Sequence, residues 1–114
     1  MVHIVVPMEP VSVNHYVKHT RLGRPYKTQE AVGYEEIGAI ACRGVSVRSR
    51  GYSVRLAIYQ GKGRKGDLDN YAKQPLDLLV KCGVIDSDAK ITELHMTKHR
   101  DIENPRTEIW VTGV

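Results

Sequence analysis

The nine residues 52–60, Tyr-Ser-Val-Arg-Leu-Ala-Ile-Tyr-Gln, constrain the fold more than any other segment of the chain. Val54, Leu56 and Ile58 alternate with other side chains, so in an extended backbone they share one face. A strand with one apolar face has to bury that face against another layer of structure. We therefore expect residues 52–60 to form a strand in a sheet that is packed against helices.

Three further segments, residues 2–6, 90–99 and 107–112, are also predicted to be strands. A first helix is expected from a Thr28 cap to about Arg43, with Gly44 as its stop. A second helix is expected over roughly 69–82, with Gly83 as its stop. Pro75 either makes the first turn of this helix irregular or begins the regular helix itself. Residues 7–27 are predicted to be a long loop. The expected order is β-α-β-α-β-β, in the α/β (α+β) class.

The length of 114 residues predicts a single domain over 1–114. The chain has no run of 18 apolar residues and no basic, apolar leader, so we expect a cytoplasmic protein without a membrane partner. Cys42 and Cys82 lie 40 residues apart, and two buried reduced thiols are the favoured interpretation over a disulfide.

Charge is distributed unevenly along the chain. Residues 1–66 contain 11 Lys and Arg against 4 Asp and Glu, a net charge of +7. Residues 67–114 contain 6 against 9, a net charge of −3. The basic part suggests a polyanionic partner such as nucleic acid, and the acidic part suggests metal-binding or catalytic carboxylates.

Asp67 and Asp69 are the first candidates for chemistry. In an extended backbone, residues two apart point to the same side, which lets both carboxylates reach one hard cation. Mg²⁺ suits this pattern because it takes a few carboxylates, several waters and phosphate oxygens. The basic run just before the pair could hold a phosphate backbone. That run consists of Lys62, Arg64 and Lys65.

A third carboxylate would come from the acidic turn Asp86-Ser-Asp88 after the second helix. Simpler interpretations also exist, because an Asp-x-Asp segment is often a solvated turn and Asp69 could be only a helix cap. A calcium loop is excluded, because neither acidic stretch continues with the glycine and glutamate that such a loop requires.

The segments Asp67-Leu-Asp-Asn-Tyr-Ala-Lys73, Leu76-Asp-Leu-Leu79 and Gly83-Val-Ile-Asp-Ser-Asp-Ala-Lys90 resemble the signature of the RusA family of Holliday-junction resolvases. The opening Pro10-Val-Ser-Val-Asn14 segment is similar to the start of that family. The resemblance is weak over residues 28–60 and strong over residues 66–90.

The resemblance implies a homodimer whose subunits contain a mixed sheet. It also implies that the protein uses Mg²⁺, for which Mn²⁺ can substitute, and that it needs no organic cofactor. It implies paired symmetric nicks at four-way-junction or other branched DNA, in recombination and repair. Matched by position, Asp67, Asp69 and Asp88 would bind metal. Lys73 would be the catalytic lysine, and Asn70 and Asn14 would contact DNA. Position 66, which can be basic in the family, is Gly66 here.

Other basic residues are candidates for contacts with the DNA backbone. They are Arg21, Arg24 and Lys27 in the predicted loop, with Arg48 and Arg50 further along the chain. Two alternatives to a resolvase remain at this point. One is a non-catalytic protein that binds branched DNA, and the other is a flap or RNA nuclease that uses the same carboxylates.

Overall fold

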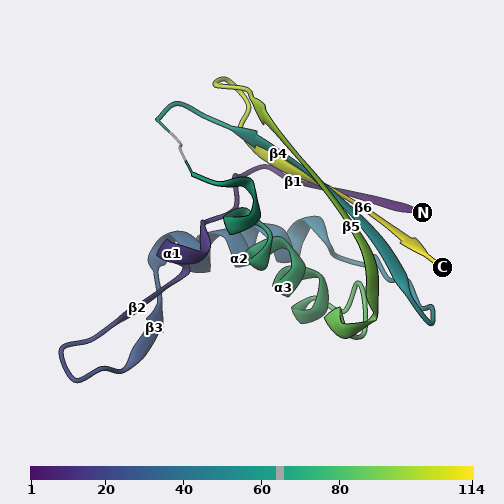
Figure 1. Ribbon diagram of the computed structural model, residues 1–114, viewed down its shortest axis with the longest axis horizontal. Coiled ribbons are helices and arrows are strands. Elements are labelled where there is room, and N and C mark those ends of the chain that lie inside the picture. The colour runs from purple at the N-terminus through teal and green to yellow at the C-terminus, as the bar shows by residue number, and fades with distance from the viewer. Residues whose placement is uncertain (64–65) are drawn as a thin grey trace.

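The structure is a computed structural model that describes residues 1–63 and 66–114 (Figure 1). In chain order its elements are β1 (Val2–Val6), α1 (Val13–Tyr16), β2 (Val17–His19), β3 (Pro25–Lys27), α2 (Gln29–Ala41), β4 (Tyr52–Gln60), the 3-10 helix η1 (Leu68–Tyr71), α3 (Lys73–Lys81), the 3-10 helix η2 (Asp88–Lys90), β5 (Ile91–Arg100) and β6 (Arg106–Gly113). The prediction of a mixed α/β (α+β) fold is confirmed.

One sheet of four strands, in the order β1-β6-β4-β5, forms the body of the molecule. β4 pairs parallel with β5 and antiparallel with β6, while β1 pairs antiparallel with β6, so the sheet is mixed. The helices gather on one face of this sheet, and the opposite face stays open (Figure 1). The predicted strands 2–6 and 52–60 coincide with β1 and β4.

The core lies between the sheet and the helices. Val54, Leu56 and Ile58 of β4 are fully buried, as the alternating pattern predicted. They pack in one cluster with buried residues of the neighbouring strands and of α2 and α3, including Ile109, Tyr34 and Leu79. Removing this apolar area from water supplies most of the free energy that holds the helices on the sheet.

The helix α2 agrees with its prediction. The Thr28 hydroxyl accepts a hydrogen bond from the Ala31 N–H and also donates to the His15 carbonyl oxygen, so one side chain caps α2 and fixes α1. The second helix is shorter than expected, because α3 begins only at Lys73 and a 3-10 turn precedes it. Pro75 lies in the first turn of α3, where a residue needs no backbone N–H because the helix offers it no acceptor. The regular helix therefore begins close to Pro75, which was one of the two expected arrangements.

The prediction of a long loop over 7–27 is wrong. The segment contains α1 and a hairpin of β2 and β3 that projects away from the body (Figure 1). Thr20 and Arg24 close the hairpin through two hydrogen bonds, Thr20 N to the Arg24 carbonyl and Arg24 N to the Thr20 hydroxyl. All residues of β2 and β3 are exposed, so no apolar alternation marks them in the sequence.

Two other expectations concern cysteines and membranes. Cys42 and Cys82 are both free thiols, as predicted, but only Cys42 is buried, whereas Cys82 is half-buried. Within the described ranges, no helix combines the length and the apolar character needed to cross a bilayer.

Gln74, at the start of α3, ties three segments together from a fully buried position. Its side-chain oxygen accepts a hydrogen bond from the Val11 N–H at 2.8 Å, and its amide nitrogen donates to the Ala31 carbonyl at 2.9 Å. The segment before α1, the first turn of α2 and the start of α3 are thereby held in a fixed relation.

Replacing Gln74 with alanine is expected to destabilise the fold by about 2–4 kcal/mol, because the buried Val11 N–H loses its acceptor and a cavity forms. Urea denaturation followed by circular dichroism measures the change. The control is Gln29→Ala, which removes an exposed glutamine and should shift the free energy of unfolding by less than about 0.5 kcal/mol. Equal effects of the two substitutions would contradict this role for Gln74.

Candidate active site

Asp67 and Asp69 lie where the chain passes from the end of β4 into α3. Asp67 has an extended backbone, with φ −74° and ψ 140°, and precedes η1, whereas Asp69 is inside that 3-10 turn. The expectation of one extended stretch across both residues is therefore wrong. The Asp67 side chain makes no capping hydrogen bond, and the residue that caps α3 is Ala72, so Asp69 is not merely a helix cap.

Asp88 begins η2, after the turn that follows α3, and lines a pocket of about 360 Å³. The pocket brings together three of the predicted site residues, Lys27, Lys73 and Asp88, which come from β3, α3 and η2. Its other lining residues are Tyr16, Glu35, Asp77, Val80 and Lys81. These residues were not predicted, because their common position depends on how the helices pack.

Lys73 is positioned by two neighbours. Its ammonium lies 3.3 Å from the Asp77 carboxylate, one helical turn on, and 5.8 Å from the centre of the Tyr16 ring. Lys27 approaches the same ring at 5.7 Å. Burial raises the pKa of Tyr16, and the charges of Asp77 and Glu35 raise it further, so the phenol remains neutral at physiological pH.

Glu35 of α2 links the two remaining lysines of the pocket. It accepts hydrogen bonds from Lys27 and from Lys81, the latter at 2.5 Å. Partial burial works to raise the pKa of Glu35, but the two lysine hydrogen bonds outweigh it and lower the pKa below the usual range. The carboxylate is therefore ionised and keeps both ammonium groups at the pocket wall.

The aspartates of the chain divide into two groups. Asp77, Asp86 and Asp101 pair with Lys73, Lys90 and Arg106. The side-chain carboxylates of Asp67, Asp69 and Asp88 have no hydrogen-bond or ion-pair partner among the residues that the structure describes. Within that same part of the chain, no three His, Cys, Asp or Glu side chains are grouped closely enough to hold a metal ion. The assignment of these aspartates as metal ligands stays a prediction.

Asp86 and Asp88 differ sharply although only Ser87 separates them. The Asp86 carboxylate accepts hydrogen bonds from Lys90 at 2.7 Å and from the Tyr52 hydroxyl at 2.8 Å. These two bonds lower the pKa of Asp86 to about 2. Asp86 thus links β4 to the turn before β5, while the Asp88 carboxylate remains open to a ligand.

The predicted DNA contacts fall in several places. Arg21 and Arg24 belong to the exposed end of the hairpin, and Lys27 ends it. Lys62 is exposed after β4, while Arg64 and Lys65 lie outside the described residues. Arg48 instead donates to the carbonyl oxygens of Val47, Gly83 and Val84, so it stabilises the turn after α3.

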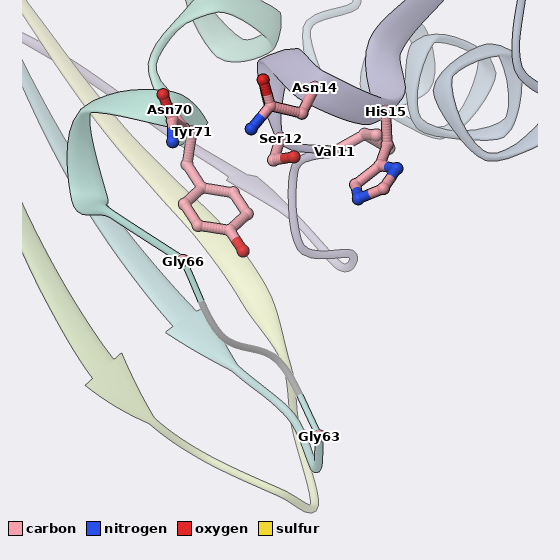
Figure 2. A pocket seen from close by; sticks show the side chains of 8 residues that line it. All are labelled: Val11, Ser12, Asn14, His15, Gly63, Gly66, Asn70 and Tyr71. Atoms are coloured by element: carbon pink, nitrogen blue, oxygen red, sulfur yellow. The ribbon is translucent and has the colours of Figure 1, made fainter. Parts of the chain in front are cut away.

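Asn14 and Asn70 face a second pocket, of about 260 Å³, that lies between α1 and the segment before α3 (Figure 2). Ser12 and His15 also line it, and neither residue was predicted. A further unpredicted residue is Lys98 of β5, whose ammonium donates to the Gly66 carbonyl at 3.3 Å. Lys98 shares a face of β5 with Leu94 and Met96, the face that turns toward the helices.

A family model described as endodeoxyribonuclease RusA matches residues 7–112. The chain belongs to the RusA family. A crossover junction endodeoxyribonuclease RusA of Enterobacteria phage 82 is 30% identical, over 96% of this chain and 92% of its own length. The protein of the same name from Escherichia coli strain K12 is 27% identical, over the same shares of both chains.

Family membership confirms the resemblance seen in the sequence and the prediction that the chain is a nuclease. The match spans both pockets, the hairpin and the segment from Asp67 to Asp88. The RusA fold in this chain therefore brings the elements that carry the signature residues to the helical side of one sheet.

The two acids of the turn after α3 should respond differently to substitution. Asp86→Asn is expected to lower the midpoint of urea denaturation, because it weakens the bonds to Tyr52 and Lys90. Asp88→Asn should leave stability within about 0.5 kcal/mol of wild type, because an exposed carboxylate without a partner is removed. Circular dichroism of both variants at pH 7 makes the comparison, and equal losses would contradict the assignment.

Proposed function

We propose that this chain is a Mg²⁺-dependent endodeoxyribonuclease that resolves Holliday junctions by paired symmetric nicks, in DNA recombination and repair. The observation that carries the proposal is the set of three unpaired aspartates, Asp67, Asp69 and Asp88, on the elements that flank Lys73. The names of the relatives, which are crossover junction endodeoxyribonucleases, support the choice of branched DNA as substrate.

The donor set suits a hard cation. Asp67, Asp69 and Asp88 offer only carboxylate oxygens, and each is exposed, so each is accessible to a hydrated cation. Mg²⁺ is held in proteins by one or two carboxylates with several waters, so a dense cage of protein ligands is not required. When bound, Mg²⁺ or Mn²⁺ would lower the pKa of a coordinated water and stabilise charge on phosphate oxygens.

Other side chains would stabilise charge and bind the DNA backbone. The Lys73 ammonium, kept in place by Asp77 and the Tyr16 ring, would stabilise the negative charge that builds on the scissile phosphate. Lys27 and Lys62 would bind neighbouring phosphates. Arg64 and Lys65 are proposed for the same role because of their charge and their position in the sequence. Asn70 and Asn14 would contact the DNA beside the acids.

We also propose that the chain works as a homodimer. A four-way junction is nearly two-fold symmetric, and a C₂ dimer supplies two sites related by the same symmetry. The open face of the sheet is the candidate surface. There the Trp110 ring stacks on His3 with ring centres 4.5 Å apart, and the Arg55 guanidinium lies 4.8 Å from the Trp110 ring centre. These flat groups would pack against a second copy.

The decisive measurement is cleavage of a synthetic four-way junction with Mg²⁺. Wild type should give symmetric nicks, and Asp69→Asn should lower the rate by on the order of 10²-fold or more while it still binds the junction. Removal of metal with EDTA should stop cleavage, and Mg²⁺ or Mn²⁺ should restore it. Glu36→Gln, which changes an exposed carboxylate on α2, is the matched control and should cleave normally.

The other outcomes separate the alternatives. Junction binding by wild type without cleavage in either metal would favour a non-catalytic protein that binds branched DNA. Faster cleavage of a flap or of RNA than of the junction would favour a different nuclease with the same carboxylates. Linear duplex of matched sequence serves as the reference for all substrates.

The hairpin of β2 and β3 should contribute to binding through phosphate contacts. Arg21→Ala is expected to weaken junction binding and to lower the slope of log K against log salt by about 1, because about one phosphate contact is lost. Arg43→Ala removes an exposed charge at the end of α2 and should leave that slope unchanged. Fluorescence anisotropy between 50 and 200 mM salt, roughly the range over which such contacts weaken strongly, measures both.

A further inference from the structure

We infer that the tip of the β2–β3 hairpin is a wedge that enters the branch point of the junction. The Leu22 side chain would lie between two bases, and the arginines beside it would bind the neighbouring phosphates. The inference rests on the proposed function, because branched DNA is the partner that the wedge would open. It goes beyond phosphate contacts by the hairpin, since it gives the apolar side chain at the tip a role in distorting the DNA.

Leu22 is 89% exposed, the largest fraction among the large apolar side chains of residues 1–63 and 66–114. Single apolar side chains on a surface are common, but this one occupies the outer end of an arm that projects away from the sheet and the helices (Figure 1). A partner that approaches along the arm therefore meets Leu22 first. Burial of this side chain against such a partner would be favourable, because apolar surface leaves water.

The backbone holds Leu22 at the apex of the hairpin. The Gly23 N–H donates a hydrogen bond to the Thr20 carbonyl at 2.9 Å, so Arg21 and Leu22 are the two central residues of a tight turn. Gly23 follows with φ +80°, a left-handed conformation that suits glycine and is typical of a three-residue hairpin loop. The turn thus presents an arginine and a leucine side by side at its outermost point.

The other end of the hairpin is anchored to the body of the molecule. The Thr28 N–H donates to the Tyr16 carbonyl at 3.3 Å, and the Thr28 hydroxyl donates to the His15 carbonyl at 2.9 Å. The Lys27 ammonium forms an ion pair with Glu35 of α2. An arm with a fixed base loses less conformational entropy when its tip binds, so force at the tip can be transmitted to the DNA.

The charge around Leu22 matches DNA. No aspartate or glutamate lies between Glu9 and Glu30 in the sequence, whereas the hairpin carries four basic residues. These are Lys18, Arg21, Arg24 and Lys27. The guanidinium groups of Arg21 and Arg24 have no hydrogen-bond partner in the described part of the chain, so they are available to phosphates. The tip therefore combines one apolar side chain with two free cations on its flanks.

This combination favours DNA over a protein partner. One leucine offers far less apolar surface than a stable protein interface buries. Proteins that kink DNA insert leucine and similar side chains between base steps, while basic side chains bind the backbone on either side. Unstacking costs least where base pairing is already disturbed, and the crossover of a four-way junction is such a place.

The hairpin also has a suitable length. Lys27, at its base, lines the same pocket as Lys73 and Asp88. Leu22 precedes Lys27 by five residues, so the tip lies at most about 18 Å from Lys27 even in a fully extended chain. That span corresponds to roughly five base steps of one DNA strand. A phosphate bound at the pocket would therefore leave the branch point within reach of Leu22.

The first test measures unstacking with 2-aminopurine, which is placed at each base around the crossover of a synthetic junction in turn. In EDTA, which prevents cleavage, saturating wild type should raise the fluorescence by about two-fold or more at the step that the wedge opens. Leu22→Ala should lose roughly half of that rise or more. Leu22→Met, which keeps an apolar side chain of similar volume, should retain the rise.

Two further variants are controls for this test. Arg21→Ala should weaken binding but keep the fluorescence rise at saturating protein, because it removes a phosphate contact and leaves the wedge. Ile40→Ala removes a side chain that is 65% exposed near the end of α2 remote from the hairpin, and it should behave as wild type. Since Leu22 and Ile40 are both exposed, neither substitution should change the urea midpoint appreciably.

The second test compares the dissociation constants for the junction and for linear duplex of matched sequence. Leu22→Ala should lower the preference for the junction by several-fold, through weaker junction binding with unchanged duplex binding. A junction with mismatched bases at its crossover is already open, so it should bring the cleavage rate of Leu22→Ala in Mg²⁺ back toward that of wild type.

A full fluorescence rise and an unchanged junction preference in Leu22→Ala would overturn this inference and leave the proposed function standing. A change confined to the assembly state of Leu22→Ala, measured by light scattering, would assign the tip to a second copy of the chain and would also overturn it. A wild type that neither binds nor cuts junctions would overturn both the inference and the proposed function.

Discussion

The buried amide of Gln74 is the constraint on which the arrangement of both pockets depends. It satisfies the Val11 N–H and bonds to the Ala31 carbonyl, so it joins the segment before α1, the helix α2 and the start of α3. A buried polar group is tolerated only when its hydrogen bonds are made, so the three segments cannot shift independently. Lys73 and Pro75, its neighbours in α3, take their places from the same fixed point.

The charges around α3 serve two different purposes. Asp77, Asp86 and Glu35 are each held by a lysine, and each such pair joins or orients elements of the fold. The carboxylates of Asp67, Asp69 and Asp88 have no hydrogen-bond or ion-pair partner in the described part of the chain. Carboxylates of this kind add little to stability, so a role in binding a cation or a substrate accounts for them better.

Sequence patterns predicted those elements whose signal is local. β1 follows from its β-branched residues, β4 follows from its apolar alternation, and α2 begins at the predicted Thr28 cap. The hairpin of β2 and β3 was missed because all its residues are exposed, so no apolar pattern marks it. The start of α3 was placed too early because the 3-10 turn around Asp69 is set by contacts that the sequence does not display.

The residues of the site also divide into those with a local sequence signal and those without one. Asp67, Asp69, Lys73 and Asp88 could be named from a contiguous signature, since the family resemblance is carried by neighbouring residues. Tyr16, Glu35 and Lys81 could not, because only the packing of α1, α2 and α3 brings them to Lys73. The preference for Asp88 over Asp86 is an intermediate case, since the spacing from Gly83 suggested it and the bonds of Asp86 to Tyr52 and Lys90 give it a physical reason.

The two pockets on the helical side of the sheet differ in the chemistry of their described lining. The pocket around Lys73 is lined by three lysines whose ammonium groups are oriented by carboxylates, and it suits a phosphate backbone. The described side chains of the pocket around Asn14 and Asn70 are instead amide, hydroxyl, phenol and imidazole groups together with Val11. The 3-10 turn and the start of α3 connect them, so Asp69, Asn70 and Lys73 lie within five residues of each other.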